Sequence, residues 1–476
     1  MPPKLAFLFS ILFILYVFHI ERRRHAQVSG ALFWPLLWFA VATSRPVGVW
    51  LSILGVPLPG STDPTEGSFI DRWFYLLLGC IGIYILSKRK IDWASILKEN
   101  AWLFSLFAFM LLSIAWSYYP VVSMKRLIKS FCAVIMVMVV LTEQNPLAAI
   151  TAVIRRCAYF HIPLSIIVIR YFRHIGIDWD WSGDAESWIG IATSKNTLGQ
   201  IAMVSAIIFI WERIQGEKDK AVRRIDILYI LMSLYLLKGS DDAVSMTSVS
   251  VFIVALFIFS MLRLMKSHMS RIKPFIALGC IAIFTVLLAV ILHSLNPASE
   301  DSFLGAIVRL MGRDPTLTGR TEIWQDVYEV ASRSPLVGVG FGAFWIGRLV
   351  NIPWTENLTW TLGQAHNGYV DTYLQLGWVG IVLLFAVFLS AIPGMVRTFR
   401  EDFDYGLFRS TLFLVILFVN ITETTFLRGE HQMWFLFLIA IISIPQRREQ
   451  PTAAPSPPLN ARPRSGQSAS WSSFYR

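Results

Sequence analysis

Charged side chains are scarce in this sequence. Only 15% of its 476 residues are Asp, Glu, Lys or Arg, whereas 55% are hydrophobic. In a soluble domain roughly a quarter of all residues are charged, so the composition excludes a soluble globular protein. It predicts an all-α fold, a polytopic transmembrane helical bundle, because a helix satisfies its own backbone hydrogen bonds within a bilayer.

Cysteines and metal-binding motifs are also rare. The four cysteines lie in or beside apolar segments, and no pair has the spacing of metal ligands. The chain contains no HExxH pair and no P-loop. We therefore expect no metal site, no cofactor and no disulfide framework. The cysteines are Cys80, Cys132, Cys157 and Cys280.

Apolar runs of about twenty residues each predict twelve or thirteen membrane spans. Residues 1–293 would hold ten of them, residues 294–368 a large loop, residues 369–445 the last three, and residues 446–476 a disordered cytoplasmic tail. Arg45-Pro46 interrupts the second run, which we expect to be kinked or re-entrant. The predicted spans are residues 5–20, 31–54, 70–87, 101–118, 125–141, 152–170, 197–211, 225–238, 246–262, 274–293, 369–394, 407–420 and 431–445.

The net charge of +11 comes from basic residues in every second connection between these runs. The positive-inside rule makes those connections cytoplasmic, so the charge indicates topology and not nucleic-acid binding. We expect residues 294–368 to lie on the opposite, outer face of the membrane. The basic connections include residues 22–24, 88–90, 155–156, 213–224, 263–273 and 397–400.

The large loop contains a predicted amphipathic helix. Apolar residues recur at helical spacing after Arg320, Thr321 can cap the helix, and Pro335 lies just past its end. Such a helix is suited to lying on the membrane surface above a site. The apolar positions are Ile323, Val327, Val330 and Ala331.

An ordered set of residues here resembles a known family. The set is Gly319-Arg320, Trp324, Pro335, Gly338, Gly340, and His366-Asn367 followed after nine residues by Gly377-x-x-Gly380. It is similar to the O-antigen ligase and polymerase superfamily. The resemblance implies an enzyme of the bacterial inner membrane, with residues 294–368 on the periplasmic face, that moves a glycan from an undecaprenyl-diphosphate-linked donor to a glycan acceptor. Its other partners would be membrane lipids and polysaccharide export or chain-length proteins, with no nucleic acid.

One difference from the ligases favours the exopolysaccharide polymerase branch of this superfamily. After the eighth span the ligases carry an arginine, whereas residues 238–248 here are rich in Ser and Thr and resemble the exopolysaccharide polymerase branch. We expect polymerisation of exopolysaccharide or O-antigen repeat units. The alternatives are ligation to lipid A core or to a protein and, in other classes, a lipid-linked oligosaccharide flippase or exporter, or a scaffold subunit.

Two residues are the candidate catalytic pair. Imidazole titrates near neutral pH, so His366 could take the proton from an acceptor hydroxyl. The alternative is that His366 is an interfacial histidine that forms a hydrogen bond with a loop. The resemblance, however, implies catalysis by the histidine of this motif. Arg320 could hold the leaving diphosphate through paired hydrogen bonds, or form an ion pair within its helix.

Further cations are candidates for substrate binding. Lys125, Arg126 and Lys129 are predicted at the outer end of the fifth span, where cations are scarce. They could hold diphosphate or extend towards lipid phosphate. Lys195-Asn196 open a later span, and the lysine would suit an anionic ligand there.

Two further polar residues complete the candidate substrate-binding set. Asn367 stands beside His366 in the family motif. Glu423, in the last outer loop, could orient His366 or the acceptor, although we favour a local ion pair with Arg428.

Overall fold

The computed structural model describes residues 1–24, 28–56, 68–179, 186–216, 219–240, 320–346 and 363–445, with a few positions between 245 and 253. This part of the chain is helical apart from one two-stranded sheet, which confirms the predicted all-α class. The predicted span at residues 274–293, nearly all of the one at residues 246–262, much of the loop at residues 294–368, and the tail lie outside the described residues.

Every predicted span within the described residues corresponds to a helix, and most of these helices begin a few residues earlier than predicted. Five are long and apolar enough to cross a membrane, or up to seven if each of two bent helix pairs is one span. The elements are α1 (Pro3–Arg24), η1 (Gly30–Leu32), α2 (Phe33–Thr43), α3 (Val47–Ile53), α4 (Phe69–Ser87), α5 (Trp93–Glu99), α6 (Ala101–Leu112), η2 (Ser113–Trp116), α7 (Pro120–Leu141), α8 (Pro146–Tyr171), α9 (Arg173–Gly176), β1 (Ile177–Trp179), β2 (Glu186–Trp188), α10 (Lys195–Ile214), α11 (Lys220–Ser240), α15 (Arg320–Ala331), α16 (Gly368–Glu401), α17 (Phe403–Val419) and α18 (Gln432–Ile441).

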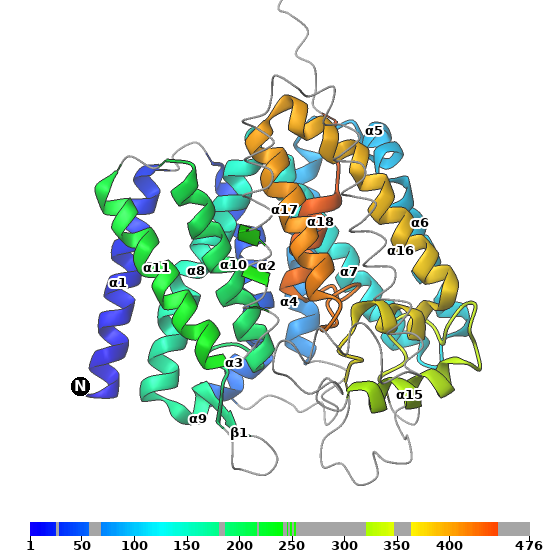
Figure 1. Cartoon of the computed structure of the whole chain (residues 1–476), viewed down its shortest axis with the longest axis horizontal. Coiled ribbons are helices and arrows are strands. Elements are labelled where there is room, and N and C mark those ends of the chain that lie inside the picture. Colours follow the sequence, from blue (N-terminus) through cyan, green and yellow to red (C-terminus); the bar gives the residue numbers. More distant parts are fainter. Residues whose placement is uncertain are drawn as a thin grey trace, which may run out of the picture. The chain divides into compact units, whose positions relative to one another are not determined.

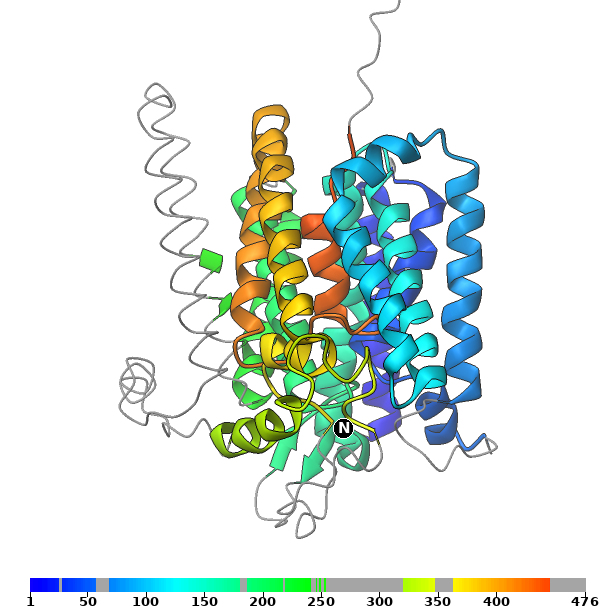
Figure 2. The same cartoon turned by 90° about the vertical axis from the view of Figure 1, so that its right-hand side faces the viewer.

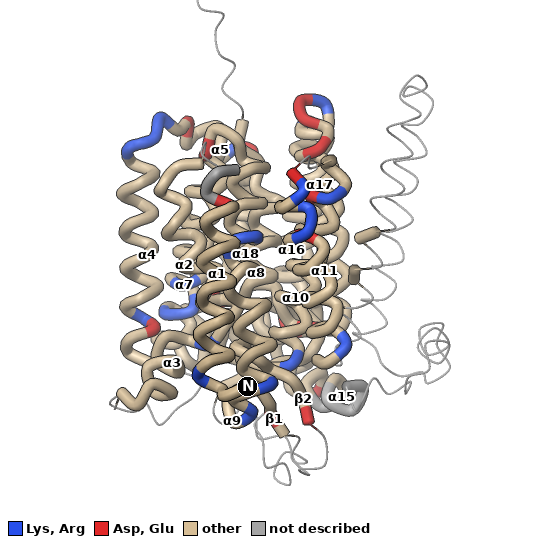
Figure 3. Tube along the Cα trace, turned by 90° about the vertical axis from the view of Figure 1, so that its left-hand side faces the viewer, with Lys and Arg blue, Asp and Glu red and all other residues tan. Residues whose placement is uncertain are grey.

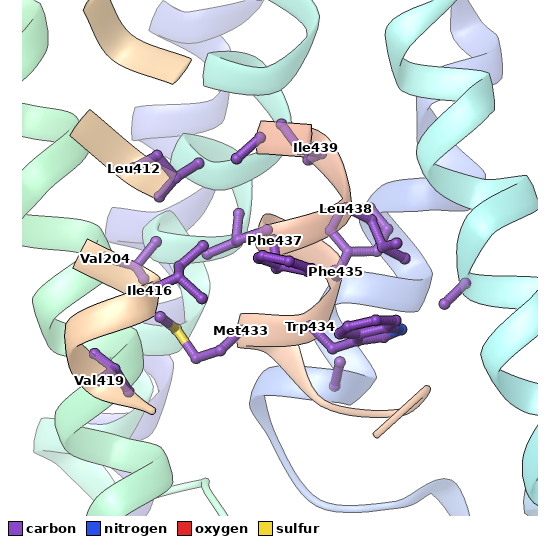
Figure 4. Close-up of a cluster of buried hydrophobic side chains, with 14 of the residues drawn as sticks. Val204, Leu412, Ile416, Val419, Met433, Trp434, Phe435, Phe437, Leu438 and Ile439 are labelled. Atoms are coloured by element: carbon purple, nitrogen blue, oxygen red, sulfur yellow. The ribbon is translucent and has the colours of Figure 1, made fainter. Parts of the chain in front are cut away.

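Helix α18 lies at the centre of the bundle. All ten of its residues are buried, as expected for a helix that is hydrophobic on every side. It packs against α2, α7, α16 and α17, and Figure 4 shows its aromatic and aliphatic side chains meeting those of α17 and Val204 of α10. This helix holds together the two groups of helices on either side of it in Figure 1.

The predicted break at Arg45-Pro46 is confirmed. The segment containing η1 and α2 meets α3 at an angle of 67°, because proline cannot continue the helical hydrogen bonding. His161 lies 2.8 Å from the carbonyl oxygen of Thr43 just before the break. The buried Arg45 guanidinium donates to the carbonyls of Ala192 and Ile175. The histidine thus pairs with a carbonyl at the bend, and the two carbonyls provide acceptors for the buried guanidinium.

The two ends of the bundle differ. Strand β1, α9, α15 and the start of α1 lie at one end, and α5 and the connection from α16 to α17 lie at the other (Figure 1). Charged residues gather at both ends, with a few inside the bundle (Figure 3). The β1–β2 hairpin was not predicted from the sequence.

The prediction that Arg155 lies in a cytoplasmic connection is wrong. Asn145 caps α8 and Pro146 opens it, so the helix begins before the predicted span. Arg155 consequently lies inside α8 and is fully buried. Its guanidinium is 2.9 Å from Asp226, 3.7 Å from Glu21 and 3.8 Å from Glu212. This charge cluster joins α8 to α1, α10 and α11.

We expect Arg155→Met to destabilise the folded protein by about 3–5 kcal/mol, because it leaves three buried carboxylates without their cation. Thermal unfolding in detergent measures the loss. Arg156→Met is the matched control, since this neighbouring arginine is only half-buried. An equal loss in both variants would show that the buried cluster contributes no specific stability.

Candidate functional site

The framework of the site is a break in α16 that pairs with a glycine-rich loop. Gly377 has φ 63° and interrupts the helix. On either side of Gly377, backbone groups of α16 form hydrogen bonds with the loop of residues 335–340. Gly340 N–H donates to the Gln375 carbonyl (3.0 Å), and Trp378 N–H donates to the Pro335 carbonyl (3.0 Å). The loop therefore supplies partners for backbone groups that the break exposes.

Close approach explains why glycines occupy this framework. A Cβ on Gly338 would lie 2.4 Å from the carbonyl of Gln375, and a Cβ on Gly377 would lie 2.4 Å from the carbonyl of Leu336. Both glycines also have positive φ, which other residues rarely adopt. Gly338, Gly340 and Gly377 of the motif are thus required by backbone geometry.

Two buried polar residues of α16 connect the framework to the histidine segment. Gln375 accepts a hydrogen bond from Gly342 N–H (2.7 Å) and donates to Asp371 (2.6 Å). Asp371 also accepts from the indole of Trp345 (2.5 Å) and from Ala365 N–H (3.4 Å). Neither residue was predicted from the sequence, although polar side chains in an apolar span were an available signal.

His366 lies at the start of α16 in a left-handed backbone conformation, with φ 50°. Its Nδ1 is 3.2 Å from the Gln364 amide and 3.8 Å from Glu423 Oε2, and its side chain is 24% exposed. Asn367 caps the helix by accepting from Tyr369 N–H and Val370 N–H. One ring edge of the histidine thus faces a carboxylate while part of the ring remains accessible.

Glu423 connects His366 to the start of α10. Its Oε1 accepts a hydrogen bond from the Asn196 amide at 2.8 Å, and the carboxylate is nearly buried. Arg428, which we expected to pair with a carboxylate of this loop, donates to the carbonyl of Gly363. The Glu423 carboxylate faces His366 and Asn196. Three segments far apart in sequence, around residues 196, 366 and 423, therefore meet at one point.

Asn420 holds the loop that carries Glu423. Its side-chain oxygen accepts from Thr425 N–H and Phe426 N–H, each at 3.1 Å. Its backbone carbonyl accepts from Gly368 N–H at 2.9 Å, which ties the loop to the first residue of α16. Asn420 was not predicted from the sequence either, because an asparagine after a helix is common at turns.

The predicted amphipathic helix is α15, and it packs beside the histidine segment. Trp324 donates from its indole to the carbonyl of Ala365 at 2.8 Å, and Tyr328 stacks on Tyr373 of α16. Figure 2 shows α15 against the lower end of α16. The predicted cap at Thr321 is wrong, because the helix already begins at Arg320. The Arg320 backbone lies about one helical turn from Trp324.

The three cations of α7 lie deeper than predicted. The helix begins at Pro120, so Lys125, Arg126 and Lys129 are inside it and not at its end. Arg126 donates to the carbonyl of Gly342 (2.6 Å), and Lys129 is 3.7 Å from Glu430. Arg126 therefore contacts the glycine-rich loop and Lys129 contacts the loop before α18. The contacts of His366 described above include none of the three cations.

Lys195 is exposed at the first turn of α10, directly after the cap formed by Ser194. It is adjacent in sequence to Asn196, which contacts Glu423. His431, at the start of α18, accepts a hydrogen bond from Met433 N–H. This histidine therefore acts as the N-terminal cap of α18.

Among the described residues, no group of three or more His, Cys, Asp or Glu side chains could hold a metal ion. The polar groups that converge at this site are an imidazole, a carboxylate and amides. Such a set can accept and stabilise a proton, and it sits beside a helix that begins with an arginine.

Comparison with known proteins supports the class predicted from the sequence. Residues 227–385 match the family described as O-antigen ligase, and this range contains Arg320, His366 and Asn367. The chain is 28% identical over 377 residues to exopolysaccharide production protein ExoQ of Rhizobium meliloti (strain 1021), a match that covers 76% of this chain and 82% of that protein. The predicted resemblance to this superfamily and to its exopolysaccharide branch is confirmed. Both matches support a multi-pass membrane glycosyltransferase of the O-antigen ligase or polymerase type.

We expect Gly338→Ala to destabilise the site framework by at least about 1–3 kcal/mol, because the added Cβ meets the Gln375 backbone and the residue must keep a positive φ. Thermal unfolding in detergent measures this loss. Gly363→Ala is the control, since a Cβ there meets no atom of the described residues within 4 Å. A Gly338→Ala protein as stable as the control would contradict the required pairing.

Proposed function

We propose that this protein polymerises exopolysaccharide or O-antigen repeat units on the periplasmic face of a bacterial inner membrane. It would take the glycan from an undecaprenyl-diphosphate-linked donor and transfer it to a hydroxyl of an acceptor sugar. The observation that carries the proposal is the meeting of His366, Glu423 and Asn196 at the start of α16.

In this reaction His366 is the general base. The acceptor oxygen attacks the anomeric carbon of the donor glycan, and the bond from that carbon to the diphosphate oxygen breaks. His366 takes the acceptor proton, while the diphosphate leaves with the bonding electron pair. Because Nδ1 faces Glu423, the other ring nitrogen is the one available to the acceptor. Glu423 then stabilises the imidazolium that forms.

The leaving diphosphate requires cations. The first backbone amides of α16 already have partners, since Gly368 N–H donates to Asn420 and the next two donate to Asn367. Side-chain cations must therefore balance the diphosphate charge. Arg320, at the start of α15, and exposed Lys195 are the residues we assign to this role.

The acceptor decides between polymerase and ligase. Similarity to a protein named for exopolysaccharide production supports transfer to another repeat unit. The description of the matching family as O-antigen ligase supports the alternative of transfer to lipid A core. A purified protein that lengthens lipid-linked oligosaccharide by whole repeat units, without lipid A, would favour the polymerase.

A flippase or exporter remains the alternative from another class. The break of α16 at Gly377 and the two bent helix pairs favour it, because transporters use discontinuous helices at their substrate sites. Transport makes no new glycosidic bond and has no use for a base at residue 366. If the protein moved lipid-linked glycan across the membrane of reconstituted vesicles and did not lengthen the glycan, this result would support the transporter.

We expect His366→Ala to reduce polymer formation from purified lipid-linked repeat units by at least about 100-fold, because general-base catalysis contributes that much or more. Glu423→Gln should cause a smaller loss, since the base remains but its charged partner is removed. Product length by gel electrophoresis measures both. His174→Ala is the matched control, because this histidine is exposed on α9 at the same end of the bundle (Figure 1).

All three variants should unfold at temperatures close to the parent. If His366→Ala is folded and retains the polymerising activity of His174→Ala, the proposed role of the imidazole is wrong. If the parent itself makes no longer product, the polymerase assignment is wrong.

A further inference from the structure

The peptide that precedes His366 is held from two sides. Ala365 N–H donates to Asp371 Oδ1 of α16 (3.4 Å), and the Ala365 carbonyl accepts from the indole of Trp324 in α15 (2.8 Å). Ala365 itself is fully buried. The path of the chain into His366 is therefore fixed by two helices, α15 and α16.

The backbone of His366 requires such support. Its φ of 50° is a left-handed conformation, which residues other than glycine keep only where their surroundings hold them. Directly after the histidine, Asn367 N–H donates to Thr424 Oγ1 (3.1 Å). The direction in which the imidazole projects thus depends on hydrogen bonds both before and after it.

Asp371 is the centre of the hydrogen bonds before the histidine. It is 1% exposed, and its Oδ1 accepts from the Trp345 indole (2.5 Å) as well as from Ala365 N–H. Its Oδ2 accepts from the Gln375 amide (2.6 Å). A buried carboxylate is costly unless it is hydrogen-bonded, and here both oxygens serve as acceptors.

The surrounding groups determine which chemical group must stand at position 371. Gly342 N–H donates to Gln375 Oε1 (2.7 Å), so the amide nitrogen of Gln375 must face Asp371. On the other side, Trp345 and Ala365 both present N–H groups. An asparagine would place its NH2 group against one of these donors. The arrangement therefore requires an acceptor at both ends of the side chain, as a carboxylate provides.

The same peptide connects the base to the helix that carries the leaving-group cation. The Trp324 indole holds the Ala365 carbonyl, and Trp324 lies about one turn along α15 from Arg320. Figure 2 shows α15 beside the lower end of α16, the end at which α16 begins. A shift of the Ala365 peptide would therefore change the position of His366 relative to the start of α15.

We propose that Asp371 is a positioning residue for the transfer reaction, an inference that rests on the proposed function. By holding the Ala365 peptide, Asp371 sets the spacing between the His366 imidazole and the start of α15. Because it is buried and both of its oxygens are engaged, Asp371 does not itself take the acceptor proton. The spacing matters because a displacement of about 1 Å can lower a rate roughly 100-fold.

Asp371→Asn tests this role through the kinetics of polymer formation. We expect kcat to fall about 10- to 100-fold with little change in the KM for the lipid-linked donor, because the base is displaced while the groups that bind the donor remain. Gln375→Glu should have a similar effect, because it sets two carboxylates against each other.

Asp71→Asn is the matched control. Asp71 is also a buried aspartate near the start of a helix, but it bonds to the Ser68 hydroxyl of α4, which can either donate or accept. This variant should keep the kcat and KM of the parent.

Exchanging the two side chains is the sharper test. In Asp371→Asn/Gln375→Glu, the new NH2 group donates to the new carboxylate. That carboxylate still accepts from Gly342 N–H, and the new amide oxygen accepts from Trp345 and Ala365. We expect kcat to return to within about threefold of the parent. A folded double variant that is as slow as Asp371→Asn would overturn the proposal.

Thermal unfolding in detergent establishes which variants are folded. If Asp371→Asn does not fold, Trp324→Phe decides, because phenylalanine keeps an aromatic ring and removes the N–H that holds the Ala365 carbonyl. This variant should lower kcat about tenfold. A parent-like kcat would overturn the link between α15 and the base.

Amide hydrogen exchange separates this inference from the proposed function, since it needs no substrate. Exchange at the Ala365 amide should be about tenfold faster in Asp371→Asn than in the parent or in Asp71→Asn, because this N–H loses a charged acceptor. Parent-like exchange in a folded Asp371→Asn protein would overturn the proposal. If exchange changes as expected but the parent makes no polymer, Asp371 still holds this segment and the polymerase assignment fails.

Discussion

The structure of the site depends on one interruption in a membrane helix. At Gly377 the backbone of α16 leaves its helical path, and the carbonyls and N–H groups released there must find partners where water is scarce. The loop of residues 335–340 provides them, and it can approach closely only because Gly338 lacks a side chain. The short helical segment before the break then has a fixed position, and His366 and Asn367 stand at its first turn.

Much of the fold could be predicted from the sequence. Apolar runs locate the spans, and Pro46 locates a bend, because both effects act through local chain chemistry. The first residues of the helices were predicted less accurately. Asn145-Pro146 opens α8 before its apolar run begins, so Arg155 belongs to the bundle interior and not to a loop. A rule that assigns every arginine to an aqueous face of the membrane cannot predict a buried arginine.

The site itself was predictable only in part. His366, Asn196 and Glu423 were each candidates, but nothing in the sequence joins positions so far apart, and the preferred partner for Glu423 was its near neighbour Arg428. Asp371, Gln375 and Asn420 were missed because their role is to satisfy backbone groups whose exposure follows from the tertiary fold. Polar residues inside apolar spans are the signal that would have found the first two.

The position of α18 has a consequence for how the protein is made. This short helix, the last one described, fills the centre of the bundle and is buried on every side by α2, α7, α16 and α17. Ten residues extend only about 15 Å, too little to hold a stable transmembrane position alone. The earlier helices therefore enter the membrane around an unfilled axis, and the interior closes only after ribosomal synthesis has passed Ile441. Until then, the faces of α2, α7, α16 and α17 that bury α18 in the complete protein lack this partner.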